Sequence, residues 1–415
     1  MKRVKETKYR FNNKEANIVG HLGYAAFKFW NELNYERLHY QEMGLEEYPD
    51  WYYQKKVHKD SFFARNLPSQ TAQDVAKRLD EAWNSYFALL EKGETKNPHP
   101  PRFKQDKMPV AFMQKAIVQN GCNIRLSLPK QLKEFMKKEY GIDDNYLYLS
   151  NPVFEGITSI KQIKLYPPDT NGECSCIVIY EVEDSVMKED NGNYLSIDLG
   201  INNLMTCYSN ASGETFIVGR MHLSLERKYL KQIERVQSQW YLAQKKKGVE
   251  NPKTSKHIQK LYEKKNNCIQ DYLHKITKKV IDYCKENSIN TIIAGDITGI
   301  REEFNKGEVL NQKMHSLPFK KLVDKLTYKA EDAGITVIRQ EEYYTSQCSP
   351  LSPSVSSKYA TGEKRIKRGR YIDGSREWNA DSVGAYNILR LYGQKSKKEI
   401  HMEPIKTPYV VKVAV

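Results

Sequence analysis

The sequence contains no long apolar segment. Nowhere do about 18 consecutive apolar residues occur, which is the length that a membrane-spanning helix needs. The first residues, Met1 to Glu6, are mostly charged, whereas a secretory signal peptide needs an apolar core. We therefore expect a protein that is neither embedded in a membrane nor secreted.

Cysteine is scarce and forms no disulfide framework. The 415 residues contain seven cysteines, a pattern typical of a protein in the reducing cytoplasm. Cys174 and Cys176 lie two residues apart and therefore face the same side of a predicted strand. Such a pair is more typical of small buried residues than of a metal site.

Acidic residues are fewer than basic ones. The chain has 66 lysines and arginines against 51 aspartates and glutamates, which gives a net charge of +15. Basic side chains gain affinity for polyanions because they release counterions from phosphates. A nucleic acid is the expected partner. A membrane surface, the other common target of basic chains, is less well supported because no apolar segment accompanies the charge.

The character of the sequence changes along the chain. Residues 1–11 predict a basic strand, and residues 12–96 show the apolar periodicity of helices. Residues 97–185 alternate in the manner of strands, with proline and glycine turns. We therefore expect a β unit that a helical insertion interrupts, followed by an acidic linker at residues 186–192.

From residue 193 onward the pattern predicts an α/β sheet. Three strands in succession, the first ending in an acid, are how ribonuclease-H-like sheets begin. The predicted strands are 194–198, 204–208, 214–218, 291–297 and 336–342, and the predicted helices are 318–333 and 380–392.

A basic helical hairpin is predicted at residues 221–285. It contains sixteen lysines and arginines against six acids, and aromatic residues are interleaved with them. A charged run is usually a solvated face, but this excess and the aromatics favour a nucleic-acid surface. The candidate contacts are Lys245, Lys246, Lys264 and Lys265.

Two aspartates are candidates for metal chemistry. Asp198 ends an apolar strand, where an acid without a metal or hydrogen-bond partners is costly. Asp381 stands in the first turn of a predicted helix, a position that also suits an ordinary acid at a helix N-terminus. Brought together, the two could hold Mg²⁺ or Mn²⁺, which prefer oxygen ligands and support phosphodiester hydrolysis.

The segments around these acids resemble one family: TnpB, the RNA-guided nuclease of insertion sequences, and its descendants, the compact type V CRISPR effectors. The resemblance is dense in the C-terminal half, in Ser-Ile-Asp-Leu-Gly-Ile-Asn-Asn-Leu at 196–204 and Asn-Ala-Asp-Ser-Val-Gly-Ala-Tyr-Asn-Ile at 379–388. It also rests on residues 292–301, 311–315, 328–337 and 342–348, and more loosely on residues 67–73 and 101–104.

The resemblance implies a fold and an activity. Residues 193–415 would form a RuvC-type nuclease domain of ribonuclease-H fold. Residues 1–11 and 97–185 would form a wedge-type β-barrel, with residues 12–96 as a helical recognition insertion. Such a protein would bind a guide RNA, read a short motif beside the target and cut double-stranded DNA with Mg²⁺ or Mn²⁺. Arg102, Lys104, Arg365 and Arg368 are further candidate nucleic-acid contacts.

The middle catalytic acid departs from the family pattern. Where most members have a glutamate, this chain has Gly295. Glu342 is the candidate replacement, because it ends a neighbouring predicted strand and because TnpB-like proteins with this Gly-Asp pattern are thought to use a relocated glutamate there. Asp296 and Glu341 are the fallbacks. Alternation along a strand lets only one of Glu341 and Glu342 face the site, and the sequence does not decide which.

The zinc ribbon of the family is incomplete. A zinc site needs two ligand pairs, but Cys348 stands alone, with Leu351 in the place of its partner, and residues 358–378 contain neither cysteine nor histidine. We therefore expect no zinc and a degenerate loop at residues 345–378 that contacts target nucleic acid.

Three functions remain open. The first is a guide-RNA-dependent DNA endonuclease that uses Asp198, Glu342 and Asp381. The second is a nuclease-dead repressor on the same scaffold, and the third, less supported, is a transposase that joins DNA ends. The resemblance implies a bacterial or archaeal cytoplasmic protein, associated with the nucleoid, that acts as a monomer or as a homodimer on one RNA.

Overall fold

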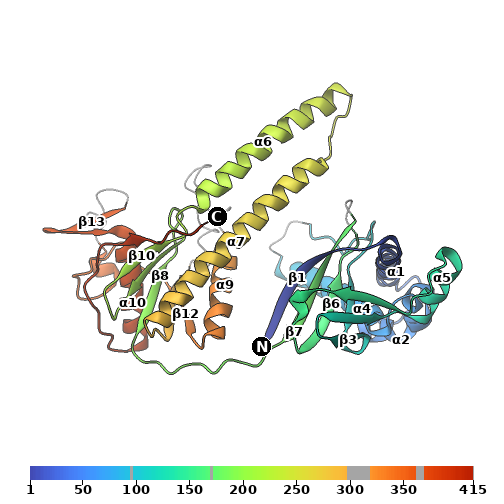
Figure 1. The fold of residues 1–415 in the computed structure, drawn as a ribbon, viewed down its shortest axis with the longest axis horizontal. Coiled ribbons are helices and arrows are strands. Elements are labelled where there is room, and N and C mark those ends of the chain that lie inside the picture. Colours follow the sequence, from blue (N-terminus) through green and yellow to red (C-terminus); the bar gives the residue numbers. More distant parts are fainter. Residues whose placement is uncertain (94–96, 169–171, 297–317, 361–368, 415) are drawn as a thin grey trace. The chain divides into compact units, whose positions relative to one another are not determined.

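The computed structural model of the chain describes residues 1–93, 97–168, 172–296, 318–360 and 369–414. The chain divides into two compact units, Met1–Glu183 and Asp184–Val415 (Figure 1). Among the described residues, none of the helices combines the length and the apolar character needed to cross a bilayer.

The strands of the first unit form two antiparallel sheets. The larger has the order β1-β7-β6-β2, with bounds Lys2–Arg10, Glu173–Glu181, Ser159–Leu165 and Val110–Met113. The smaller joins β3 (Ile117–Asn120), β4 (Asn123–Ser127) and β5 (Tyr146–Ser150). Both sheets are open in the part of the chain that the structure describes, and the closed wedge-type barrel stays a prediction. Cys174 and Cys176 are buried on one face of β7, as their spacing predicts.

Five α-helices accompany these sheets. Asn12 begins α1 with a capping box, since its side chain accepts from the Glu15 amide while the Glu15 carboxylate accepts from the Asn12 amide. The helices are α1 (Asn13–Leu38), α2 (Trp51–Val57), α3 (Phe62–Arg65), α4 (Ser69–Lys92) and α5 (Lys130–Tyr140). Helix α5 lies in a segment that the sequence predicts as strand.

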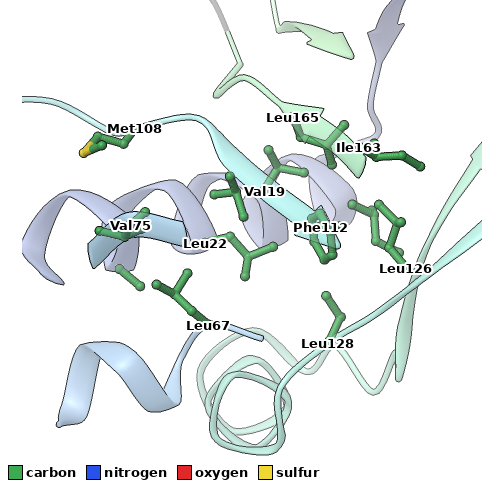
Figure 2. Close-up of a cluster of buried hydrophobic side chains, with 14 of the residues drawn as sticks. Val19, Leu22, Leu67, Val75, Met108, Phe112, Leu126, Leu128, Ile163 and Leu165 are labelled. Carbon is green, nitrogen blue, oxygen red and sulfur yellow. The ribbon is translucent and has the colours of Figure 1, made fainter. Parts of the chain in front are cut away.

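The core of the first unit joins the helices to both sheets. Figure 2 shows Val19 and Leu22 of α1 pointing toward Phe112 of β2, with Leu126 and Ile163 of the two sheets close by. Because this core draws on residues from both ends of the unit, the helical segment folds together with the strands.

A buried polar network holds the helices of this unit together. The fully buried Arg37 guanidinium donates to Gln54 Oε1 and to Asp80 Oδ1, each at 2.9 Å. Next to it, His58 Nε2 lies 2.9 Å from Glu36 Oε1, and its Nδ1 lies 3.2 Å from Glu32 Oε1. Hydrogen bonds to these two carboxylates raise the pKa of His58 to about 9.

This network predicts a pH dependence of stability. The pKa of His58 rises from 6.5 in the unfolded chain to about 9, so its stabilisation is complete below pH 6.5 and disappears as the pH rises through 9. We expect His58→Gln to lose on the order of 2 to 3 kcal/mol at pH 6 and much less at pH 9.5. Urea unfolding at both pH values measures this. An equal loss at both would contradict a charged His58.

The second unit is built on a mixed six-stranded sheet of order β12-β11-β8-β9-β10-β15. Strand β8 pairs antiparallel with β9 and parallel with β11, and β11 pairs parallel with β12. The strands are β8 (Tyr194–Asp198), β9 (Met205–Ser209), β10 (Thr215–Val218), β11 (Thr291–Asp296), β12 (Thr336–Glu341) and β15 (Tyr409–Val410).

Four long helices occur among the described residues of this unit. Helix α10 (Ala380–Ser396) packs against β8, β9 and β11, and α7 (Lys256–Glu286) packs against α9 (Phe319–Asp332). Helices α6 (His222–Lys246) and α7 form a long hairpin that extends beyond the sheet (Figure 1). A short β-hairpin, β13 (Arg370–Asp373) with β14 (Arg376–Asn379), precedes α10. The basic hairpin and the strand-helix alternation predicted from the sequence are therefore confirmed.

Candidate active site

The carboxyl ends of three neighbouring strands bring acidic residues to one edge of the sheet. Asp198 ends β8, Asp296 ends β11, and Glu342 directly follows β12. The three strands run parallel, with Ala294 opposite Ile197 and Asp296 opposite Glu341. Parallel strands of equal register end at the same edge, so residues nearly 150 positions apart in the sequence become neighbours.

The Glu342 carboxyl group occupies the space beside Gly295. A Cβ atom placed on Gly295 would lie 1.7 Å from Glu342 Oε1 and 2.7 Å from Glu342 Cδ. Non-bonded carbon and oxygen atoms do not approach to such distances. The glycine is therefore required by the position of Glu342, whose carboxyl group reaches from the end of β12 into the space that a side chain on Gly295 would fill.

A second glycine makes room for Asp198. A Cβ atom on Gly384, in the second turn of α10, would lie 2.6 Å from Asp198 Oδ2. Helix α10 thus approaches the end of β8 closely because position 384 has no side chain. Glu342 and Asp198 thus each lie directly against a glycine, which has no Cβ atom.

Glu342 is buried among like charges. Burial, together with the neighbouring carboxylates of Asp198 and Asp296, raises the pKa of its carboxyl group to about 9. Its Oε1 atom is buried and has no hydrogen-bond partner among the described residues. A buried acceptor without a donor costs free energy unless a cation or another group compensates it.

Glu341 points elsewhere. Its Oε2 atom lies 3.0 Å from Lys395 Nζ in an exposed ion pair. Successive side chains on a strand face opposite sides, so Glu341 on one side places Glu342 on the other. Glu342 therefore lies beside Asp198, and Glu341 pairs with Lys395 instead. That Glu342 is the third metal ligand stays a prediction.

Asp381 lies in the first turn of α10. Asn379 caps this helix by accepting hydrogen bonds from the Asp381 and Ser382 amides. The Asn203 amide donates to Asp381 Oδ2 at 2.8 Å and fixes the carboxylate. Asp198, Asn203 and Asp381 line one cavity of about 730 Å³.

The structure brings the predicted acids together as two neighbouring pairs that share Asp198. Glu342 faces Asp198, and Asp198 shares the cavity with Asp381. Among residues with a described position, no three acidic, histidine or cysteine side chains converge on one metal-sized point. The set nevertheless fits a divalent cation, because its donors are carboxylate oxygens and because the buried Oε1 of Glu342 has no hydrogen-bond partner among the described residues.

The raised pKa predicts that metal binding releases a proton. At pH 7.5 the Glu342 carboxyl group is protonated, since its pKa is about 9, but a metal ligand must be deprotonated. We expect Mg²⁺ titration by calorimetry, in two buffers of different ionisation enthalpy, to show about one proton released per protein, and tighter binding toward pH 9. Glu342→Gln should release none. Equal release by both proteins would contradict this role.

None of the predicted nucleic-acid contacts with a described position lines the cavity. Arg102 and Lys104 are exposed in the first unit, where Lys104 Nζ lies 4.7 Å from the Trp30 ring centre. Lys245 and Lys246 are in the last turn of α6, and Lys264 and Lys265 are in α7. Arg365 and Arg368 lie outside the described residues. The role of all these residues stays a prediction.

Some residues of the site have no clear signal in the sequence. Asn203 holds Asp381 across 178 positions, and Gly384 seats Asp198. The sequence features that could have pointed to Asn203 and Gly384 are the asparagine pair after the turn at Gly200 and the small residues in the first turns of α10. Arg220 and Arg227 also line the cavity, although the sequence marks them only by their positive charge near or within the hairpin.

The loop after Glu342 is held by its own polar groups. Cys348 is buried, and its sulfur lies 3.4 Å from the carbonyl oxygen of Ser356. The Asn387 side chain of α10 donates to the carbonyl oxygens of Thr345 and Cys348 at 2.9 and 2.8 Å. These bonds fix the described part of the loop, residues 345–360 and 369–378. That it holds no zinc stays a prediction.

Two family models match the chain. One, OrfB_IS605, described as a probable transposase, matches residues 177–301. The other, described as a Cas12f1-like TNB domain, matches residues 319–388. The first region contains Asp198 and Gly295, and the second contains Glu342 and Asp381.

Similar proteins match over most of the chain. The TnpB-like protein ORF457 of Acidianus two-tailed virus is 24% identical over 92% of this chain and 88% of its own length. The CRISPR-associated endodeoxyribonuclease Cas12f1 of Syntrophomonas palmitatica is 21% identical over 72% of this chain and 62% of its own. The cryo-EM structure of a Cas12f1-sgRNA-target DNA complex has the same fold, with a TM-score of 0.60, 14% identity, and coverage of 91% of this chain and 83% of that chain.

Proposed function

The chain belongs to the family of TnpB proteins and compact type V effectors, and on that premise we propose that it is an RNA-guided DNA endonuclease. It binds a guide RNA, recognises a short motif beside the target and hydrolyses DNA in a RuvC-type site. The residues 193–415 form the nuclease domain, and its sheet of three antiparallel strands followed by parallel strands supports a ribonuclease-H-like fold.

The observation that carries this proposal is the position of Glu342. Its carboxyl group fills the space beside Gly295, next to Asp198, and one of its oxygens has no hydrogen-bond partner in the described part of the chain. Burying an acid beside two others is destabilising. A scaffold without catalytic activity gains nothing from that arrangement, whereas a nuclease uses it to bind cations.

The mechanism assigns roles to the residues of the chain. Asp198, Glu342 and Asp381 would hold Mg²⁺ or Mn²⁺. When bound, such ions activate water and stabilise the leaving oxygen in phosphodiester hydrolysis. Asn203 orients the Asp381 carboxylate, and Gly295 and Gly384 let Glu342 and Asp198 reach their positions. To act as such a ligand, the Glu342 carboxyl group would have to release its proton to solvent.

Target choice follows from base pairing in this proposal. A guide RNA pairs with one DNA strand, and the protein recognises the shape of the duplex and a short adjacent motif. The net charge of +15 and the likeness to a Cas12f1 that was solved in complex with sgRNA and target DNA support such partners. Residues 1–185 would contact the guide and the motif, and the protein would act as a monomer or as a homodimer on one RNA.

The protein purified together with its cellular RNA tests this function. Incubated with Mg²⁺ and a plasmid library that carries the guide-matched target beside random sequence, it should linearise a subset of plasmids with a common adjacent motif. Binding without cleavage under any divalent metal would establish the nuclease-dead repressor instead. Purification without a defined RNA would overturn both RNA-guided functions.

A further inference from the structure

Helix α6 presents one face to the cavity that contains Asp198 and Asp381. Arg220, in the turn before the helix, and Leu223, Ser224 and Arg227 line this cavity. Their spacing of three, four and seven residues places them on one side of a helix. The adjacent stripe of α6, which includes His222, Leu225 and Glu226, is buried in the unit. The side of α6 that lines the cavity is thus distinct from its buried side, and both arginines lie on the cavity side.

The turn that leads into α6 is tightly constrained. Gly219 has a φ of +86°, and a Cβ atom on it would lie 2.7 Å from Leu204 Cβ. The chain therefore turns at Gly219 in close contact with Leu204, at the end of the loop that follows Asp198. This contact holds the beginning of α6, and with it Arg220, beside the carboxylates.

Both arginines are available for a ligand. Their side chains are exposed, and within the part of the chain that the structure describes neither has a hydrogen bond or an ion pair. The first turn of α6 has no acidic residue and no side-chain cap. A helix N-terminus already carries partial positive charge, so Arg220 beside it adds to a local preference for an anion, and Arg227 lies in the second turn of the same helix.

We propose that Arg220 and Arg227 bind the DNA phosphates on the two sides of the scissile bond. This inference rests on the proposed nuclease function. The cavity combines two carboxylates, which suit cations, with two guanidinium groups, which suit phosphates and bind them with two parallel hydrogen bonds. The arginines are seven residues apart, about 10 Å along the helix axis, which fits phosphates on either side of a cleaved bond.

The experiment uses the protein–guide RNA complex and a target whose strands are already separated over the guide-matched region, so that unwinding does not limit the rate. Single-turnover cleavage is measured for wild type, Arg220→Gln, Arg227→Gln, the double variant and Arg227→Lys. Arg339→Gln is the control, because Arg339 is an exposed arginine of the same unit that pairs with Asp324, lies outside the basic hairpin and does not line the cavity. Phosphates near the scissile bond are replaced one at a time by neutral methylphosphonates.

We expect Arg220→Gln and Arg227→Gln each to cut about 10-fold more slowly and the double variant about 100-fold, with Arg227→Lys in between and Arg339→Gln unchanged. Methylphosphonates at the contacted positions should slow wild type but not the double variant. Cleavage by the double variant at the wild-type rate, or equal sensitivity of both proteins to the methylphosphonates, would overturn the inference.

A second measurement does not depend on cleavage. Target affinity is measured in EDTA over a range of salt concentrations. Each lost contact to a single-stranded phosphate lowers the slope of log affinity against log salt by about 0.7, so the double variant should lose about 1.4. If wild type cuts no DNA with any metal, the proposed nuclease function fails. The salt slopes then still test phosphate binding by the two arginines, and an unchanged slope in the double variant overturns it.

Discussion

Replacing Glu342 by glutamine should lower single-turnover cleavage on the order of 10³-fold, which corresponds to about 4 kcal/mol of transition-state stabilisation, without weakening target binding. Glutamine has the shape of glutamate but cannot complete a set of anionic metal ligands. The measurement compares cleavage of a labelled target and its binding in EDTA, both with the protein–RNA complex. If the variant cuts at the wild-type rate, Glu342 is not part of the active site.

Two controls separate chemistry from folding. Glu341→Gln should cut normally, because Glu341 pairs with Lys395 at the surface. Glu342→Gln should be at least as stable as wild type at pH 8. The pKa of Glu342 rises from 4.5 to about 9 on folding, so its stabilising effect is complete below pH 4.5 and is lost as the pH rises through 9. At pH 8 the carboxyl group of wild type must take up a proton on folding, a cost that glutamine does not have, and lower stability of the variant there would contradict the account.

Gly295→Ala should reduce cleavage on the order of 100-fold although it adds only a methyl group. The new Cβ would lie 1.7 Å from Glu342 Oε1 and 3.1 Å from Ile388 Cδ1, so the Glu342 carboxyl group must leave its place. Cleavage rate and Mg²⁺ affinity should fall together in titrations of the rate against metal concentration.

Gly20→Ala is the matched control for this substitution. Its Cβ would meet only the flexible end of Lys107, at 3.1 Å, inside a helix where alanine is favoured over glycine. This variant should fold and cut like wild type. Normal cleavage by Gly295→Ala would show that the Glu342 carboxyl group is not needed beside position 295.

The sequence predicted those parts of the molecule whose signals are local. Apolar strands ending in acids, the helix that begins at Ala380 and the charged hairpin have periodicities and caps within a few residues. Helix α5 was missed because its apolar residues, Leu132 and Met136, are few and stand between segments that alternate like strands. Its helical state is decided by packing against the first core.

Features that depend on contacts between distant segments could not be predicted. Gly295 indicated that an acid is missing from its strand. That Glu342 lies next to this position follows only from the pairing of the strands in the folded sheet. The choice between Glu341 and Glu342 depends on where β12 ends, a boundary that sequence patterns place only to within a few residues. The bond from Asn203 to Asp381 and the cavity face of α6 have no sequence signature.

Exchanging the two positions tests the central claim most directly. Glu342→Gly alone should be inactive, and the reciprocal variant with Gly295→Glu and Glu342→Gly should regain measurable Mg²⁺-dependent cleavage, because a glutamate on β11 then reaches the same space from the neighbouring strand. The measurement is the single-turnover rate of both variants and of wild type with one guide RNA. Cleavage by Glu342→Gly at the wild-type rate, or no cleavage by wild type itself, would contradict the account.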